Sequence, residues 1–589
     1  MNRPRFRRRW LIALVTFGLL VSHAAADVPA NWLAGNSHRI NLVSPAIAAP
    51  CGLPGDVNQD GYVNDLDIAA VAQAWRAQPP DPAYDVVPDG QIDVKDITFI
   101  ASNAGQSCSG GTRLWGVNMF EEMTDPNARA KVTNAGMNSV RLYIEWRSIE
   151  PTNQNLTPQK VTNYDATIAT LESDGLIPYL TIQNAPSWAA KYACGPLYGS
   201  GNPGDDTYYQ EFAELMYALV ERYDGDGVDD MPGLLYPIHY FELYNEPDWN
   251  GGPSSAPGGC WGSNDIDGDG VNDQKEYAHL LQAIYPAMKA ADPSSQLVFG
   301  SVAYETYSGS QFNMQFTEKV LSELDNDPNA AANGYYFDVM GFHQYDAFRD
   351  NWDGFGYPSP PACGTTWTPL PEPQNLPYNQ AVAGKAANLA WILGCHGLSK
   401  PMAASEVGLQ VTLGGVPPAQ RLQKQAHAVV HLLVRSAAIG MPVVSWYTLV
   451  DRPSDSLQYG LFNSNWQARP AYTAYTVATG QLLDATFDTQ LFPNQTGSQY
   501  IQAYRFTAPD GTKKLVLWTD AGCKLKGSTC PDMAVNMTIT ADVLGVPAAS
   551  FTGQLQVTSE SGSVQFVNIA NGSATLTIHQ APVYVQLAP

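Results

Sequence analysis

Eight short apolar segments alternate with helical patterns between residues 112 and 480, and this alternation limits the folds open to the chain. The apolar segments lie at 114–119, 139–144, 177–183, 237–245, 296–303, 336–343, 401–407 and 442–450. Amphipathic patterns, such as those at 208–223 and 426–440, fill the gaps. Eight strand–helix repeats predict an α/β fold, a closed (β/α)8 TIM barrel. A doubly wound open sheet is the alternative, but its glycine-rich phosphate-binding turn is missing after the first apolar segment.

After residue 480 the pattern changes to strands without intervening helices. Residues 500–520 read as a hairpin whose turn is Asp510-Gly511, and residues 573–587 read as another alternating pair. This pattern predicts a C-terminal β-sandwich over residues 481–589. Such a domain either supports the barrel or binds carbohydrate.

The first residues have the features of an export signal. Five arginines among residues 1–9 precede an apolar run at 11–21, and Ala24-Ala25-Ala26 offers a cleavage site. A membrane anchor is the alternative, but it needs about 20 apolar residues, and this run is shorter. We therefore expect a signal peptide at 1–26, a linker at 27–50, and a secreted protein with no membrane attachment after cleavage.

The charge and the cysteines narrow the choice of partner and compartment. A net charge of −24 argues against nucleic acid and anionic membranes as partners. Eight cysteines fit an oxidising compartment, and none falls in a CxxC pattern that would indicate zinc. Sequence alone does not fix their pairing. The simplest hypothesis is sequential: Cys51–Cys108, Cys194–Cys260, Cys363–Cys395 and Cys523–Cys530.

Two glutamates stand at predicted strand ends. Glu246 follows the fourth apolar segment in "FELYNEP", and Glu406 ends the seventh in "PMAASEV". Active sites of (β/α)8 barrels lie at the carboxyl ends of the strands, so both side chains are expected at one mouth. Two carboxyl groups separated by roughly 5 Å are what retaining glycoside hydrolysis requires.

Asn245-Glu246-Pro247 together with the strand-end Glu406 resembles glycoside hydrolase clan A, in particular families 39 and 5, over residues 112–480. The resemblance implies that Glu246 is the general acid/base and Glu406 the nucleophile, with no catalytic cofactor. It also implies a β-linked glycan as substrate, such as a plant-type polysaccharide or its oligosaccharides. It assigns substrate-side roles to five further residues: Arg141 beside the nucleophile, Asn245 at the sugar 2-hydroxyl, His343 at substrate or acid/base, Tyr345 holding the nucleophile, and Trp446 as a sugar-stacking floor.

Each of these residues taken alone has a structural alternative. Arg141 serves equally well in a salt bridge, His343 as a core histidine and Trp446 in barrel packing. The interpretation depends on the whole set, which occurs in the expected order along the strands. For the complete protein, the alternative is a non-catalytic carbohydrate-binding or adhesion protein on the same barrel.

Residues 51–108 contain two loops with the spacing of calcium ligands. The first loop offers Asp56, Asn58, Asp60, the Tyr62 carbonyl, Asn64 and Asp67, and the second offers Asp85, Asp89, Asp93 and Asp96. Two such loops between flanking cysteines resemble a type I dockerin, a small helical calcium-binding domain. The resemblance implies a cohesin-bearing scaffold protein as partner. A calcium-stabilised spacer without a partner is the alternative.

A third loop, at residues 265–276, matches the calcium spacing more closely. It offers Asp265, Asp267, Asp269, the Val271 carbonyl, Asp273 and Glu276. Because it follows the fourth strand, we expect structural calcium there to stiffen the rim of the sugar cleft. A partial copy with Asp224, Asp226 and Asp230 reads either as an ion site or as an Asp/Gly turn.

Overall fold

The computed structural model describes most of the barrel and of the C-terminal region. The described residues are 57, 71–72, 74–75, 84, 86–87, 91–103, 113–198, 207–250, 260–303, 312–313, 315–346, 363, 381–412, 417–452, 458–519 and 532–589. The predicted signal peptide and linker lie outside these residues. So do the predicted calcium ligands of the first module, except Asp93 and Asp96.

All eight predicted apolar segments form strands, and the strands close into one barrel in chain order. The strands are β1 Leu114–Asn118, β2 Ser139–Glu145, β3 Ile177–Gln183, β4 Tyr240–Leu243, β5 Gln296–Val302, β6 Val339–Asp346, β7 Met402–Leu409 and β8 Val443–Trp446. Each pairs in parallel with its neighbour, and β8 pairs with β1 to complete the ring. The prediction of a (β/α)8 barrel is confirmed.

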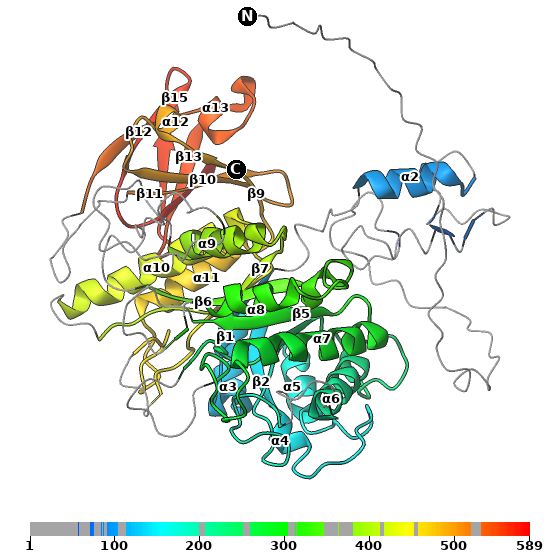
Figure 1. The fold of residues 1–589 in the computed structure, drawn as a ribbon. Helices are drawn as coiled ribbons and strands as arrows, with labels where there is room; N and C mark the ends of the chain where they lie inside the picture. The colour runs from blue at the N-terminus through cyan, green and yellow to red at the C-terminus, as the bar shows by residue number, and fades with distance from the viewer. Residues whose placement is uncertain are drawn as a thin grey trace, which may run out of the picture. The chain divides into compact units, whose positions relative to one another are not determined.

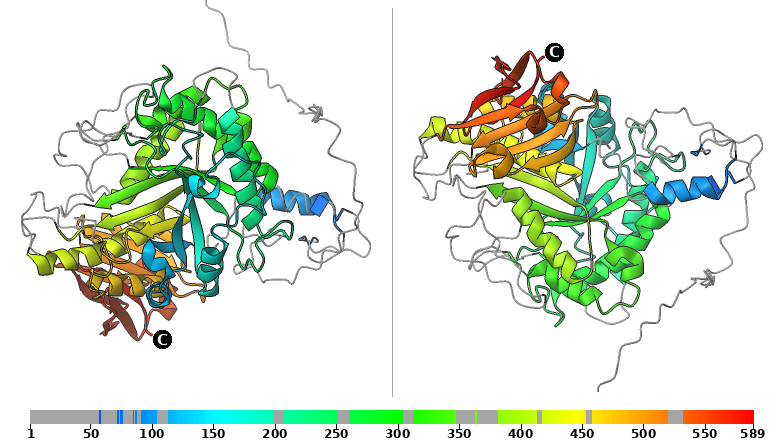
Figure 2. Two further views of the ribbon diagram at one scale, coloured as in Figure 1. Left: turned by 90° about the horizontal axis from the view of Figure 1, so that it is seen from below. Right: turned by 90° about the horizontal axis from the view of Figure 1, so that it is seen from above.

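Helices between the strands form the outer layer of the barrel (Figures 1 and 2). They are α3 Pro126–Asn134, α4 Trp146–Ile149, α5 Asp165–Ser173, α6 Thr207–Tyr223, α7 Asp273–Ala291, α8 Phe316–Leu324, α9 Ala381–Cys395, α10 Pro418–Ala438 and α11 Pro470–Leu482. Short 3-10 turns occupy Glu121–Thr124 and Ala331–Tyr336. Helix α10 begins eight residues before the predicted pattern at 426, at a proline, which is favoured at the first helical position.

The barrel interior is filled rather than open. One buried cluster comes only from strands: Leu114, Tyr179, Val298, Val339, Ala403 and Val443. Side chains of this kind pack in layers inside such barrels. Polar side chains therefore gather farther along the strands, toward their carboxyl ends.

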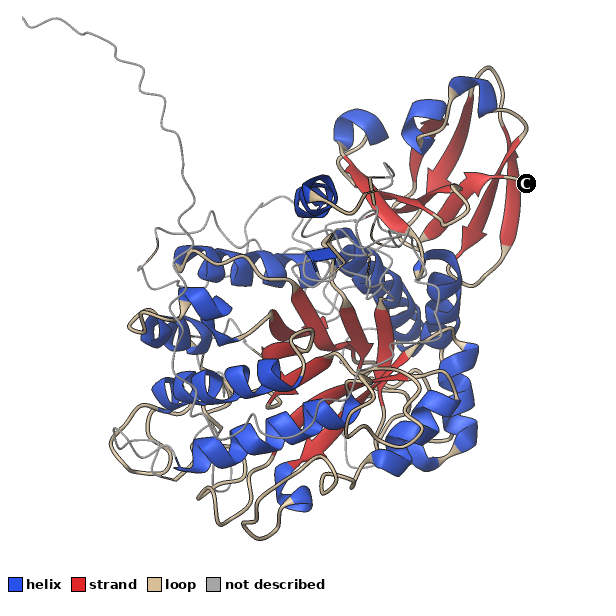
Figure 3. Cartoon of the chain, turned by 90° about the vertical axis from the view of Figure 1, so that its right-hand side faces the viewer, coloured by secondary structure: helices blue, strands red, loops and turns tan. Residues whose placement is uncertain are grey.

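The C-terminal region contains two sheets with a common core, so the predicted β-sandwich is confirmed (Figure 3). The first sheet has the order β14-β13-β16-β11-β10-β9, and the second pairs β12 with β15. The strands are β9 Thr486–Leu491, β10 Ile501–Thr507, β11 Lys513–Thr519, β12 Val535–Thr540, β13 Gln554–Ser559, β14 Val564–Asn568, β15 Ser573–Ile578 and β16 Val583–Leu587. Short helices α12 Pro493–Thr496 and α13 Ala541–Leu544 and a 3-10 turn at Ala548–Ser550 complete this region.

Side chains of the first sheet contact the barrel helices. Trp518 of β11 stacks on His431 of α10, with ring centroids 4.4 Å apart, and lies 5.3 Å from the guanidinium of Arg435. Lys514 Nζ donates to the carbonyl of Gln481 in α11 at 3.0 Å. These contacts favour a supporting role for the sandwich.

Two of the four hypothesised disulfides are present. Cys194 bonds to Cys260 and Cys363 to Cys395, whereas Cys51, Cys108, Cys523 and Cys530 lie outside the described residues. The first disulfide links the loop after β3 to the loop after β4. In the N-terminal module, helix α2 Val94–Asn103 contributes to a small core with Val71 and Ile92. Of the helices that the structure describes, none is long and apolar enough to cross a membrane.

A buried ion pair after β8 provides a test of the fold. Arg469, before α11, donates to Asp451 from Nη1 at 2.9 Å, and both side chains are over 90% buried. Arg469→Met leaves the Asp451 carboxylate buried and unpaired, which costs about 3–5 kcal/mol. We expect a clearly lower thermal unfolding midpoint by calorimetry.

The matched control is Arg147→Met, which removes an exposed pair with Glu145. Such pairs contribute about 0.2–1 kcal/mol, so the midpoint should hardly move. Equal losses in the two variants would contradict the proposed importance of the buried pair.

Candidate active site

Glu406 lies within β7, at a break in the regular pairing. The register with β6 shifts between Phe342 and His343, so that Phe342 pairs with Ala404 but His343 pairs with Glu406. Ser405 is thus an extra residue in a β-bulge, and bulges next to active sites re-aim side chains. Ser405 and Glu406 are consecutive, yet both contact residues inside the barrel, which regular alternation would not allow.

Glu246 lies three residues beyond β4, which ends at Leu243, earlier than the predicted 245. Tyr244 and Glu246 both have positive φ, at +62° and +46°. Pro247 disfavours the right-handed helical region for the preceding residue, and Glu246 N donates to Ser301 O at 3.1 Å. A non-glycine residue held in the left-handed region costs about 1–3 kcal/mol, and such residues cluster at functional sites.

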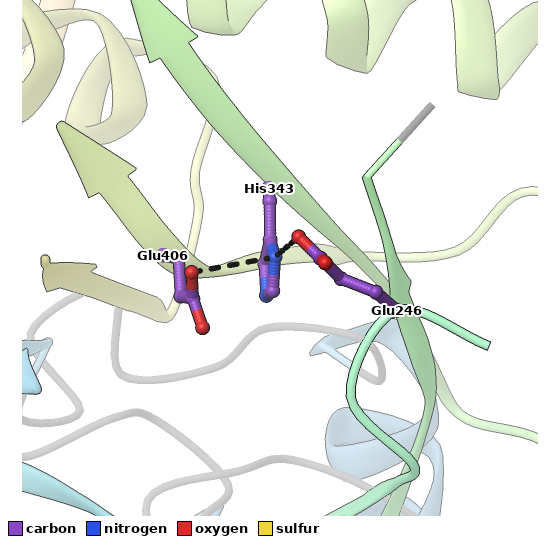
Figure 4. A group of neighbouring side chains, drawn as sticks. All are labelled: Glu246, His343 and Glu406. Carbon is purple, nitrogen blue, oxygen red and sulfur yellow. Dashed lines mark hydrogen bonds and ion pairs between the residues drawn. The ribbon is translucent and has the colours of Figure 1, made fainter. Parts of the chain in front are cut away.

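Glu246, which follows β4, faces His343 and Glu406, which lie within β6 and β7 (Figure 4). One side-chain oxygen or nitrogen from each lies within 4.8 Å of those of the other two. His343 Nδ1 is 2.8 Å from Glu246 Oε1 and 3.6 Å from Glu406 Oε2. The two glutamates therefore belong to one cluster of side chains, and the imidazole lies between them.

Arg141 of β2 connects Glu406 to a second buried acid. Its Nη1 donates to Glu406 Oε1 at 2.6 Å, and its Nη2 donates to Glu242 Oε1 and to Asn245 Oδ1, the latter at 2.9 Å. Arg141 and Glu242 are both fully buried. Burial opposes the charge of Arg141, but Glu242, Tyr143 and Glu406 more than offset this and hold its pKa well above the usual value.

Two tyrosines complete the surroundings of Glu406. Tyr345 of β6 donates its hydroxyl to Glu406 Oε2, and Tyr143 of β2 donates to Oε1 at 3.1 Å. Burial, together with the charge of Glu406, raises the pKa of Tyr345 well above its usual value. Burial also raises the pKa of Tyr143, although Arg141 acts against it. Both tyrosines therefore remain protonated donors.

A chain of hydroxyl groups runs behind His343. His343 Nε2 lies 3.0 Å from Ser405 Oγ, Ser405 Oγ donates to Ser301 Oγ at 2.8 Å, and Ser301 Oγ donates to Glu242 Oε2 at 3.0 Å. Tyr179 also donates to Glu242 Oε2, at 2.6 Å. Burial lowers the pKa of His343 to about 4, so the imidazole is neutral at physiological pH.

The structure does not support the predicted stacking floor at Trp446. The side chain is only 1% exposed, and its Nε1 donates to the carbonyl of Tyr459 at 3.0 Å. Its neighbour Tyr447 is half-buried and packs edge-on against Tyr345 and Tyr459. Tyr447 rather than Trp446 thus presents an aromatic surface on this side of the pocket.

Other tryptophans near strand ends divide in the same way. Trp146 and Trp261 are fully buried and pack against other rings, whereas Trp188 and Trp249 keep part of their surface exposed.

Sequence reasoning missed the groups that hold the predicted residues in place. Tyr143 was detectable, because it stands two residues after Arg141 in a strand and so faces the same side. Glu242 was also detectable, as an acid inside an apolar strand. Ser405 was not, because only the bulge turns it inward beside Glu406. Ser301 had no sequence signal beyond its place in β5.

Several predicted calcium ligands are described. Asp265, Asp267 and Asp269 bring one carboxylate oxygen each to within 4.8 Å of one another. Asp273 Oδ1 accepts from Ile266 N at 3.1 Å. In the N-terminal module, Asp96 accepts from the backbone of Val87 and Asp93, at 2.9 and 2.8 Å, and so closes the second predicted loop.

Comparison with protein families supports two domains. Residues 98–382 match the cellulase model of glycosyl hydrolase family 5, and residues 54–103 match the type I dockerin domain. The first match spans β1 to β6 and includes Glu246, whereas Glu406 lies beyond it. No curated protein matches the chain.

Solved structures resemble the fold at low sequence identity. A family 39 glycoside hydrolase from the gut symbiont Bacteroides cellulosilyticus WH2 has a TM-score of 0.52 and 18% identity, covering 82% of this chain and 83% of its own. A glucosidase from Croceicoccus marinus has a TM-score of 0.50 and 12% identity, covering 81% of this chain and 96% of its own. The protein therefore contains a glycosyl hydrolase domain that matches family 5, preceded by a type I dockerin domain.

Proposed function

We propose that the protein is a secreted retaining glycoside hydrolase that cleaves β-linked glycans by double displacement. The observation that carries the proposal is the proximity of Glu246 and Glu406, whose nearest carboxylate oxygens lie within 4.8 Å of each other. Retaining enzymes place two carboxyl groups roughly 5 Å apart, whereas inverting enzymes leave room for a water between them. The short separation therefore favours direct attack by one carboxylate.

Glu406 is the nucleophile in this proposal. Its side chain is 8% exposed and accepts from Arg141, Tyr143 and Tyr345. Hydrogen bonds and a cation that act on the charged form favour an ionised carboxylate. Glu406 would attack the anomeric carbon and form a glycosyl ester, which a water molecule then hydrolyses.

Glu246 is the general acid/base, and the hydroxyl chain explains how its proton is held. The Ser301 hydroxyl donates its hydrogen bond to Glu242, so it accepts the hydrogen bond that Ser405 donates. His343 must then donate from Nε2 to Ser405, which leaves Nδ1 as an acceptor facing Glu246. An acceptor at 2.8 Å stabilises the protonated carboxyl, which can donate to the leaving oxygen.

The side chains of Glu246 and Glu406 also differ in their exposure to solvent, in a way that fits these roles. The Glu246 side chain is 26% exposed, compared with 8% for Glu406. The acid/base must reach the leaving group and later a water molecule, so access at Glu246 is useful. Asn245 Oδ1 accepts from Arg141, which leaves the Asn245 amide NH2 to donate to the sugar 2-hydroxyl.

The remaining domains place this activity in context. The proposal assigns residues 1–26 to a signal peptide, 27–50 to a linker, 51–108 to the calcium-binding dockerin domain, 112–480 to the catalytic domain and 481–589 to the sandwich. The type I dockerin implies docking to a cohesin-bearing scaffold protein. Val94 and Lys95, which we assign to its docking face, are both exposed.

Glu406→Gln tests the nucleophile. The amide cannot form the glycosyl ester, so turnover of aryl β-glycosides and β-glycans should fall below detection while the unfolding midpoint is kept. The matched control is Glu121→Gln, which changes an exposed glutamate after β1 and should leave turnover intact.

For the wild type, product NMR should show the β-anomer first, and first appearance of the α-anomer would contradict retention.

Glu246→Gln should slow glycan hydrolysis by roughly 10²–10⁴-fold, because general acid catalysis contributes about this factor. Aryl glycosides with acidic phenols need little protonation, so the rate of their glycosylation step should fall much less. A uniform loss across leaving groups, measured by pre-steady-state kinetics, would argue against this role for Glu246.

The hydroxyl chain predicts a change in pH dependence. Ser405→Ala removes the acceptor for His343 Nε2, so Nδ1 is no longer fixed as the acceptor for the Glu246 proton. A lost hydrogen bond to the protonated form lowers the pKa of Glu246, and the alkaline limb of kcat/KM should move to lower pH. A rate reduced equally at every pH would indicate a merely structural role for Ser405.

A further inference from the structure

Glu276 is a buried acid that the proposed reaction does not use. It lies in the first turn of α7 and is 0% exposed, and within the described part of the chain neither carboxylate oxygen has a hydrogen-bond partner. An ionised carboxylate buried without a partner costs several kcal/mol. The native protein therefore needs either a proton or a cation at this position.

Other acids surround Glu276. The charges of Asp265, Asp267, Asp269 and Asp273 all act on the Glu276 carboxylate. Of these aspartates, Asp265, Asp267 and Asp269 bring one carboxylate oxygen each to within 4.8 Å of one another. The nearby Lys191 donates to the carbonyl of Asp267 at 2.7 Å, so its ammonium contacts the backbone of the loop.

We infer that Asp265, Asp267, Asp269 and Glu276 bind a calcium ion in the catalytic domain, separate from the calcium of the dockerin. The four side chains occupy positions 1, 3, 5 and 12 of a twelve-residue loop, the spacing of calcium ligands in helix–loop–helix sites. Gly270 at position 6 forms the sharp turn of the loop with φ +91°, a backbone conformation that glycine adopts more readily than other residues.

The remaining positions of the loop fit the same ion. Val271 at position 7 offers its carbonyl oxygen, and position 9 commonly acts through water, which suits Asp273 because it already accepts from Ile266 N. Calcium takes six to eight oxygen ligands in flexible geometry, whereas magnesium keeps several waters. A set of oxygen ligands supplied mostly by the protein therefore favours calcium.

This ion would brace the segment that carries Glu246. Tyr277, next to Glu276, donates its hydroxyl to Leu243 O at 3.0 Å and accepts from Gly300 N at 3.1 Å. These contacts lie at the end of β4 and within β5. Trp261 packs edge-on against both Tyr244 and Tyr277, and its neighbour Cys260 is tied to Cys194. Calcium at the start of α7 would thus hold the end of β4 in place through the contacts of Tyr277 and Trp261.

The test counts calcium ions on the full chain, with calcium chloride as the probe. After removal of metal and dialysis against calcium, native mass spectrometry should find one ion fewer on Glu276→Gln than on the wild type. The dockerin ions are common to both proteins and cancel in the difference. Glu318→Gln, which removes a partly exposed acid on α8, is the matched control and should bind the wild-type number.

Thermal unfolding of the same proteins gives an independent readout. With calcium, Glu276→Gln should melt below the wild type. With excess chelator the order should reverse or the difference vanish, because the variant no longer buries an unpartnered carboxyl group. If Glu276 had a purely structural role, Glu276→Gln would lower the unfolding midpoint by the same amount with calcium and with chelator.

A second variant keeps the inference testable if Glu276→Gln does not fold. Asp269 is exposed, so Asp269→Asn should be tolerated while weakening calcium binding. An unchanged number of bound ions in either folded variant, at calcium concentrations that saturate the dockerin, would overturn the inference.

Discussion

The guanidinium of Arg141 organises the centre of the barrel. It joins the proposed nucleophile, Glu406, to a second buried carboxylate, Glu242, and it also donates to Asn245. A buried charge is tolerated only when it is paired and its hydrogen bonds are satisfied. Because one cation pairs with both acids, the positions of both carboxylates depend on the same guanidinium. The precision of the pocket follows from this shared dependence.

The same network gives the two proposed catalytic glutamates different surroundings. Glu406 lies on a strand and is surrounded by donors, whereas Glu246 lies beyond a strand, next to a neutral imidazole whose acceptor nitrogen faces it. The difference begins at Glu242, since its carboxylate accepts the last proton of the serine chain and so fixes the direction of every hydrogen bond back to His343. Glu242, which is fully buried, thereby sets which nitrogen of His343 faces Glu246 as an acceptor.

Much of this arrangement was predictable, because the apolar segments of the sequence indicate the strands and their order. Eight apolar segments predicted the barrel, and Glu246, Glu406, Arg141, His343 and Tyr345 do come together. The errors have local causes. Trp446 was expected to face the sugar, but β8 ends there with the indole buried, so Tyr447 takes the open side. Ser405 escaped detection because a β-bulge breaks the alternation on which a sequence-based prediction relies.

Strain at Glu246 connects the pocket to the acidic loop. A residue held at φ +46° keeps that conformation only if its surroundings over-determine it. Pro247 restricts one side, the bond to Ser301 O restricts the other, and Tyr277 fixes the carbonyl of Leu243 three residues earlier. Tyr277 in turn follows Glu276, whose buried charge needs compensation. Any ion that supplies this compensation therefore acts on Glu246 through Tyr277, the residue next to Glu276, and its hydrogen bond to the carbonyl of Leu243.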